Sequence, residues 1–372
     1  MSDISAKQLR TQIKEHFLAH FSDRGYEPIE NRNIVPRDDA TVLFCGATIS
    51  TLKDKIRNRT PIPGRWAIAQ RCLRLHDLGN AKATAPRQYL SYFEMVSVLA
   101  TETSYAEFLG AVLAYVLPVL HGRGLELEIW TRTTDLRRQS DLLDARNRHP
   151  FTLTWDRAQK YEWTYGEPGV SGLGCLFHLR KQNAPCREFG QVIQIFRDGS
   201  PIGYEFGFGV ETFSSLLLGG ADAYASSPAN EVFRLPDDTI NRALLDHLVA
   251  ALAILAEDVR PGRGKRESVL RAIVNTIHRE FHANIEQIDT FEDKLHQLST
   301  SYFGTRTPSD DLIAILQHKE RQQVENEIRI EDYIRNQHNL VRLGLLDQPR
   351  ASRNIDRYKQ KMQSDSDARF HA

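Results

Sequence analysis

The sequence lacks a long apolar segment, paired cysteines and an excess of either charge. Residues 1–14 are polar and charged, and they contain no apolar core of the kind that a secretory signal requires. The longest apolar stretch, residues 111–120, is shorter than the about 20 residues that a membrane-spanning helix needs, and Pro118 interrupts it. We therefore expect a cytoplasmic protein without a membrane partner.

The four cysteines, Cys45, Cys72, Cys175 and Cys186, lie far apart, and none belongs to a CxxC pair. This spacing disfavours a disulfide framework and a cysteine-ligated zinc site. Lysine and arginine together number 48, as do aspartate and glutamate, so no net positive field attracts nucleic acid to the whole molecule. RNA binding stays open, because a local basic face is enough to contact phosphates.

The first 225 residues have the pattern of an α+β domain, an antiparallel sheet with helices packed on it. Apolar spacing predicts helices over residues 13–21 and 104–121. Strands are predicted at residues 41–44, 66–68, 89–98, 125–131, 189–196 and 202–208. Asp198-Gly199 separates the last two strands and predicts a hairpin, because glycine accepts the positive φ of a tight turn.

The chain changes character after Pro228, where helical periodicity replaces the β-branched runs. Helices are predicted at residues 244–259, 267–281, 285–298 and 310–345. A chain of 372 residues is long enough for about two domains. We therefore expect one domain at residues 1–225, an all-α domain at 236–345, and a polar, disordered tail at 346–372.

Two histidine pairs, His16 with His20 and His278 with His282, have the i, i+4 spacing that zinc sites use on a helix face. Neither pair carries the glutamate of an HExxH motif, and every cysteine precedes residue 187. We predict no metal site there and interpret both pairs as solvated helix faces.

Several short motifs occur together in an order that resembles the alanyl-tRNA synthetases, which are class II aminoacyl-tRNA synthetases. They are Asn33-Ile-Val-Pro36, Leu52-Lys-Asp54, Gln70-Arg-Cys-Leu-Arg74, Tyr92-Phe-Glu-Met95, Trp163-x-x-Gly-Glu-x-Gly-x-x-Gly172, Gly207-Phe-Gly-Val-Glu211, Asp246-His247 and Val269-Leu-Arg271. The resemblance extends from about residue 10 to residue 280. It implies the antiparallel class II sheet followed by a helical acceptor-stem domain, without the editing domain of that family.

The resemblance implies a role for Arg74 in amino-acid activation, in which a carboxylate attacks the α-phosphate of ATP. A cation must offset the two approaching negative charges, and the fork of an arginine grips both groups. The same resemblance assigns Asp77, Tyr92, Phe93 and Glu211 to ATP binding. Tyr92 and Phe93 are neighbours in a strand, so one of them faces the site, and the sequence leaves open which one.

The resemblance also implies an amino-acid pocket. It assigns Trp163 to a wall of the pocket and Gln191 and Glu205 to the groups that hold the substrate ammonium. Gly207 and Gly209 are also assigned to amino-acid binding. Glu205 and Gln191 stand where the family has an aspartate and an asparagine, and each is longer by one methylene. A change of one methylene in a pocket shifts affinity by about 1–3 kcal/mol, enough to alter the preferred amino acid.

Two positions depart from the family pattern. Thr212 stands where class II enzymes have an arginine that meets the γ-phosphate. The family also has a glutamate that helps to hold ATP and Mg²⁺; the gapless match puts Leu176 at that position, and a shift of two residues puts His178 there. None of these side chains can replace those groups, since leucine and histidine have no side-chain oxygen for Mg²⁺ and threonine has no charge. Arg180, Lys181 and Arg187 are the nearby cations that could compensate.

A basic stretch in the helical region resembles the segment that docks the acceptor stem of tRNA. Its cations are Arg260, Arg263, Lys265, Arg266 and Arg271. Lysine and arginine clusters favour phosphates through counterion release. The resemblance further implies a possible homodimer through the helix near Ile13 and the strand to Pro36.

Three functions follow from this pattern. The first is a stand-alone enzyme that activates alanine or a similar small amino acid with ATP and Mg²⁺, and transfers it to tRNA or another acceptor in a specialised pathway. The second is a non-catalytic paralogue that binds an amino acid or tRNA as a regulator or partner subunit. The third is a transferase that takes its acyl group from aminoacyl-tRNA without using ATP.

Overall fold

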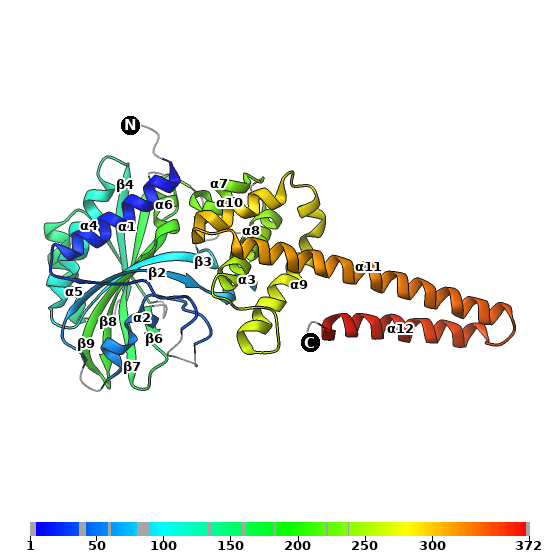
Figure 1. The fold of residues 1–372 in the computed structure, drawn as a ribbon. Helices are drawn as coiled ribbons and strands as arrows, with labels where there is room; N and C mark the ends of the chain where they lie inside the picture. The colour runs from blue at the N-terminus through cyan, green and yellow to red at the C-terminus, as the bar shows by residue number, and fades with distance from the viewer. Residues whose placement is uncertain are drawn as a thin grey trace. The chain divides into compact units, whose positions relative to one another are not determined.

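The structure is a computed structural model (Figure 1). It describes residues 5–36, 42–58, 61–79, 89–132, 136–157, 161–181, 184–220, 222–236 and 238–369. The chain forms two compact units, Met1–Asp246 and His247–Ala372.

The described strands of the first unit form one nine-stranded sheet (Figure 1). They are β1 (Glu27–Ile29), β2 (Arg65–Leu73), β3 (Tyr92–Ala100), β4 (Leu125–Arg132), β5 (Thr152–Asp156), β6 (Glu162–Thr164), β7 (Val170–Lys181), β8 (Arg187–Arg197) and β9 (Ser200–Gly209). Their order is β1-β2-β3-β9-β8-β7-β4-β5, with β6 paired to β7. Only the pairs β1–β2 and β4–β5 are parallel among the described ladders. The predicted α+β class with a largely antiparallel sheet is confirmed.

The predicted hairpin joins β8 to β9. Asp198 has a φ of 48° and Gly199 a φ of 80°, so both central residues of the turn adopt the left-handed region. Two such residues match the right-handed twist of the strands that they connect. The hairpin brings the β8 and β9 residues of the predicted site onto neighbouring strands.

Helices cover one face of the sheet. These helices are α1 (Ala6–Ser22), α4 (Tyr105–Leu120), α5 (Leu136–Arg148) and α6 (Val210–Leu217), and they contribute to one large apolar core. Phe17 of α1 and Tyr115 of α4 meet edge to face, with ring centroids 5.1 Å apart. Ser104 caps α4 by accepting a hydrogen bond from the Glu107 backbone N–H at 3.2 Å.

The opposite face is covered in part by α2 (Ile49–Arg57), which packs on β2 and β3 through a smaller apolar cluster. The strand predicted at residues 41–44 is wrong for residues 42–44, and Thr41 lies outside the described residues. The segment crosses the end of β2 instead, where the Cys45 carbonyl accepts from the Leu73 N–H at 2.8 Å. The described residues of this unit also form the short helices α3 (Leu75–Gly79), the 3₁₀ turn Ala223–Ser226 and α7 (Pro228–Phe233).

The second unit is helical. Helix α8 (Thr239–Leu255) begins in the first unit and continues into the second, followed by α9 (Lys265–Glu286), α10 (Phe291–Phe303), α11 (Thr307–Arg342) and α12 (Gln348–Arg369). The boundary after Asp246 lies beyond the one expected near residue 225. No helix among the described residues is long and apolar enough to cross a membrane.

Residues 348–369 form α12, where the sequence suggested a disordered tail. Two contacts hold this helix to α11. The Tyr333 and Tyr358 rings stack with centroids 4.0 Å apart, and Asn354 donates to Gln337 at 3.1 Å. Ala351 is fully buried on the same side. The apolar positions of α12 are too sparse to stand out in a polar sequence, but they share one helix face.

Candidate active site

A cavity of about 40 Å³ lies on the sheet face opposite α1 and α4. Phe93 and Met95 of β3 line it, whereas Val96 and Val98 of the same strand pack in the main core. Five predicted site residues line the cavity: Arg74, Phe93, Gln191, Gly207 and Gly209. The sheet order β2-β3-β9-β8 accounts for this gathering, because it places segments that are distant in sequence side by side.

Arg74 follows β2 directly, and two contacts fix its side chain. Its Nε donates to the Gly46 carbonyl at 2.7 Å, and its guanidinium carbon lies 4.8 Å from the centre of the Phe93 ring. The described residues accept no hydrogen bond from its two terminal nitrogens. A guanidinium that is held by its Nε in this way presents the terminal N–H groups to an anion.

The structure distinguishes the two aromatic candidates. Phe93 pairs with Cys72 across the ladder and lines the cavity. Tyr92, its neighbour in the strand, is buried and is not a lining residue. Adjacent side chains in a strand point to opposite faces, so Phe93 is the aromatic residue on the side of the cavity.

Trp163 does not line the cavity itself but contacts Gln191, which does. Its indole N–H donates to the Gln191 side-chain oxygen at 3.2 Å. The ring lies over the glycines of β7, and a Cβ on Gly174 would come within 3.0 Å of the Trp163 ring. Glycine at that position therefore makes room for the indole, which holds Gln191 in one orientation.

Glu205 lies on β9, two residues before Gly207, and is only 4% exposed. The Tyr165 hydroxyl donates to it at 3.1 Å. Burial raises the pKa of Glu205 to about 7, since no described cation offsets the loss of solvation. Glu205 does not line the small cavity itself, but a ligand ammonium next to it would stabilise its charged form.

Glu211 and Asp77 are placed differently. The Glu94 N–H donates to both carboxylate oxygens of Glu211, at 3.3 and 3.1 Å, so this side chain joins α6 to β3. Burial raises its pKa to about 7, and the nearby Glu94 carboxylate adds to the effect. Asp77 lies in α3, and its side chain is outside the described residues.

A larger cavity of about 580 Å³ contains Thr212, Arg187 and Glu188. Glu188 also lines the small cavity, so the two are neighbours. Of the cations that could compensate for Thr212, Arg180 forms an ion pair with the buried Glu128, whereas Arg187 lines this cavity. Leu176 is buried and pairs with Gln191 across the ladder.

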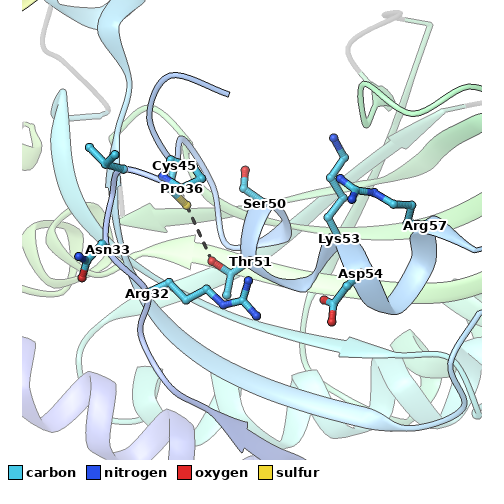
Figure 2. A pocket seen from close by; sticks show the side chains of 10 residues that line it. Arg32, Asn33, Pro36, Cys45, Ser50, Thr51, Lys53, Asp54 and Arg57 are labelled. Atoms are coloured by element: carbon cyan, nitrogen blue, oxygen red, sulfur yellow. Dashed lines mark hydrogen bonds between the residues drawn. The ribbon is translucent and has the colours of Figure 1, made fainter. Parts of the chain in front are cut away.

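A third cavity, of about 450 Å³, lies between α2 and the segment that follows β1 (Figure 2). Lys53 and Arg57 come from one side of α2, and both contact Glu167, at 2.9 and 3.3 Å. Cys45 also lines this cavity, next to Gly46, whose carbonyl holds Arg74. The pKa of the Cys45 thiol is lowered to about 7, mainly because this thiol is hydrogen-bonded to the Cys72 thiol.

Sequence reasoning missed two polar side chains near the site, those of Glu188 and Ser97. Glu188 accepts from the Tyr89 hydroxyl at 3.0 Å and lines two cavities. The Ser97 hydroxyl is fully buried without a hydrogen bond to the described residues, and Ser97 pairs with Gly207 across the ladder. The sequence offered a signal for Glu188 alone, because this charged residue stands at the start of the apolar run that forms β8.

The predicted RNA-binding cations of the second unit lie around the start of α9. Two of them brace the preceding loop: Arg260 pairs with Asp311 at 2.7 Å, and Arg271 donates to the Gly262 carbonyl at 2.6 Å. Arg263 and Lys265 are exposed, and Arg266 is half-buried.

His16 is exposed, as expected for a solvated helix face, whereas His20, His278 and His282 are partly buried. His20 packs against Tyr115, with ring centroids 5.5 Å apart. His278 and His282 both contact Glu320, at 3.3 and 3.0 Å. Burial lowers the pKa of His278; burial also acts on His282, but the hydrogen bond and charge of Glu320 outweigh it and raise that pKa. The described residues contain no cluster of three or more potential metal ligands.

Comparison with known proteins gives a consistent result. A family model described as tRNA synthetases class II (A) matches residues 12–105. The alanine–tRNA ligase of Sorangium cellulosum is 24% identical over 333 residues, which cover 73% of this chain and 35% of that protein. That of Legionella pneumophila is 24% identical over 358 residues, covering 85% of this chain and 41% of that protein.

Among solved structures, a pyrrolysyl tRNA synthetase from Desulfitobacterium hafniense aligns with a TM-score of 0.36 and 13% identity, covering 58% of this chain and 72% of that chain. The chain spans 35% and 41% of the length of the two alanine–tRNA ligases above.

Proposed function

We propose that this alanyl-tRNA synthetase-like class II protein is an enzyme that activates a small amino acid with ATP. The observation that carries the proposal is Arg74, held over Phe93 beside Gln191 and Gly207 in one small cavity. In this reaction a carboxylate oxygen of the amino acid forms a bond to the α-phosphorus. The bond from that phosphorus to the bridging oxygen breaks, and pyrophosphate leaves.

The proposed role of Arg74 is to stabilise the charge that builds up at the α-phosphate. Its Nε is used by the Gly46 carbonyl, so the guanidinium is oriented before substrate arrives. A preoriented donor costs no reorganisation during the reaction, and removal of one such group typically lowers the rate by about 10²–10³-fold.

The proposed amino-acid site uses Glu205, Gln191 and Trp163. A buried carboxyl with a raised pKa favours a cationic ligand, which makes Glu205 a suitable partner for the substrate ammonium. Trp163 restricts the space over the β7 glycines, which favours an amino acid with a small side chain, such as alanine. The unpartnered Ser97 hydroxyl is a further polar group for this ligand.

The donor set supports ATP with Mg²⁺, with two changes from the family pattern. Glu188 supplies carboxylate oxygens, the ligands that Mg²⁺ prefers, where Leu176 supplies none. Arg187 supplies a cation in the cavity that contains Thr212. When bound, the metal ion would neutralise phosphate charge. The acceptor of the activated amino acid is proposed to be tRNA, with the exposed Arg263 and Lys265 at its acceptor stem.

Binding of ATP tests the nucleotide part of this proposal. We expect ATP with Mg²⁺ to raise the melting temperature, and we expect a smaller effect without Mg²⁺. The alternative function, a non-catalytic paralogue, predicts a shift with an amino acid or tRNA and none with ATP. The departures at Thr212 and Leu176 favour that alternative. A melting temperature that does not change with added ATP would therefore support the non-catalytic paralogue.

A further inference from the structure

Helix α12 has two different faces. One face packs on α11 through Ala351, Tyr358 and Met362, of which Ala351 and Met362 are at most 7% exposed. The Tyr358 ring stacks on Tyr333 of α11. The apolar face of α12 is therefore already covered within the second unit.

The other face carries a row of cations. Arg350, Arg353, Arg357 and Lys361 are all exposed. Their spacing of three, four and four residues places them within an arc of about 80° at roughly 100° per residue, and along about 16 Å of the helix at 1.5 Å per residue. We call these four residues the α12 stripe.

Described acidic side chains do not neutralise the arginines of the α12 stripe. No ion pair to a described side chain is found for Arg350, Arg353 or Arg357, and Asp356 is the one acidic residue between positions 348 and 362. Two arginines of helix α11 differ, because they pair along that helix: Arg329 with Glu325 at 3.8 Å and Arg335 with Asp332 at 3.2 Å. The arginines Arg350, Arg353 and Arg357 therefore form a local positive field on a molecule with no net charge.

We propose that the α12 stripe binds the phosphate backbone of RNA. The identification of that RNA as a transfer RNA rests on the proposed function. Three of the four cations are arginines, whose planar fork can bind a phosphate through two parallel hydrogen bonds. A membrane surface is disfavoured, because an interfacial helix needs a free apolar face and that of α12 is buried against α11.

The test is the salt dependence of binding to a fluorescein-labelled transfer RNA pool, with the full chain. The triple variant R350Q/R353Q/R357Q removes three charges from the stripe. The matched control R321Q/R329Q/R335Q removes three exposed charges from α11. We expect the stripe variant to reduce the slope of log affinity against log salt by about 2, with about 10–100-fold weaker binding at low salt. The control should bind within twofold of the unmodified chain.

The proposal would be overturned if the stripe variant and the control variant had the same RNA affinity and the same salt dependence. It would also be overturned if the unmodified chain bound no RNA. A third contrary outcome is a stripe variant that binds RNA as the unmodified chain does but no longer binds phosphatidylserine vesicles or polyglutamate. Far-ultraviolet circular dichroism checks that both variants keep their helices. Amino-acid-dependent pyrophosphate exchange should be the same in all three proteins, so failure of the RNA surface is distinguishable from failure of the proposed activity.

Discussion

The guanidinium of Arg74 lies 4.8 Å from the centre of the Phe93 ring, and its Nε is held by the Gly46 carbonyl at 2.7 Å. Phe93 lies on β3 and Arg74 directly follows the neighbouring strand β2, and both residues line one cavity. A cation over an aromatic face gains about 0.5–2 kcal/mol, depending on its solvation. This contact positions the cation of the proposed site before any ligand binds.

Substitution of Arg74 should strongly reduce amino-acid activation. We expect Arg74→Gln to lower the rate of pyrophosphate exchange by about 10²–10³-fold, since the phosphate charge then has no preoriented partner. Arg71 is the matched control, because it lies on β2 three residues before Arg74 and is exposed. Arg71→Gln should leave the rate unchanged, and equal losses in the two variants would show that Arg74 has no specific role.

Amino-acid binding should release a proton from Glu205 at pH 6 to 7. Its pKa of about 7 means that a substantial fraction is protonated there, and a substrate ammonium favours the charged form. Calorimetric titrations in buffers of different ionisation enthalpy measure this release. Glu205→Gln should bind more weakly and release no proton, and an unchanged proton count in that variant would contradict the assignment.

The same carboxyl should make stability depend on pH. The folded pKa of Glu205 lies above its ordinary value of 4.5, so its contribution is fully present below pH 4.5 and is lost as pH rises through 7. The shift corresponds to roughly 3 kcal/mol. Chemical denaturation between pH 5 and 8 should show stability falling with pH, and less steeply in Glu205→Gln. A residual slope is expected from Glu211, whose pKa is also raised to about 7.

Gly207 should tolerate no side chain. A Cβ there would lie 3.0 Å from both Met95 Cε and the Val96 carbonyl oxygen, so Gly207→Ala should destabilise the fold by about 1–3 kcal/mol. The control is Gly110→Ala in α4, where a Cβ meets nothing within 4 Å. It should stabilise by about 0.5–1 kcal/mol, because alanine is the better helix former. This packing would be contradicted if both variants shifted the denaturation midpoint in the same direction relative to the unmodified chain.

Arg187 should matter for ATP rather than for the amino acid. We expect Arg187→Gln to raise KM for ATP several-fold and Arg187→Lys to retain most of the affinity, since charge is the property required. Thr212 lines the same cavity, so Thr212→Arg should restore ATP binding in the Arg187→Gln background. A KM for ATP that is unaffected by Arg187→Gln would remove Arg187 from the nucleotide site.

The sequence predicted the sheet, the hairpin and five residues that line one cavity, because short motifs and strand alternation are local signals. It did not predict Tyr165 as the partner of Glu205, since 40 residues separate them and only the strand order brings them together. It also suggested a disordered tail where α12 forms. The stacking of Tyr358 on Tyr333 is a tertiary contact between two polar helices, and composition alone cannot reveal it.

The most direct test of the central claim is amino-acid-dependent exchange of labelled pyrophosphate into ATP, with each of the 20 amino acids in turn. The account predicts exchange with alanine or another small amino acid, a requirement for Mg²⁺, and loss of exchange in Arg74→Gln but not in Arg71→Gln. No exchange with any amino acid, from a chain that is folded and binds an amino acid, would contradict it.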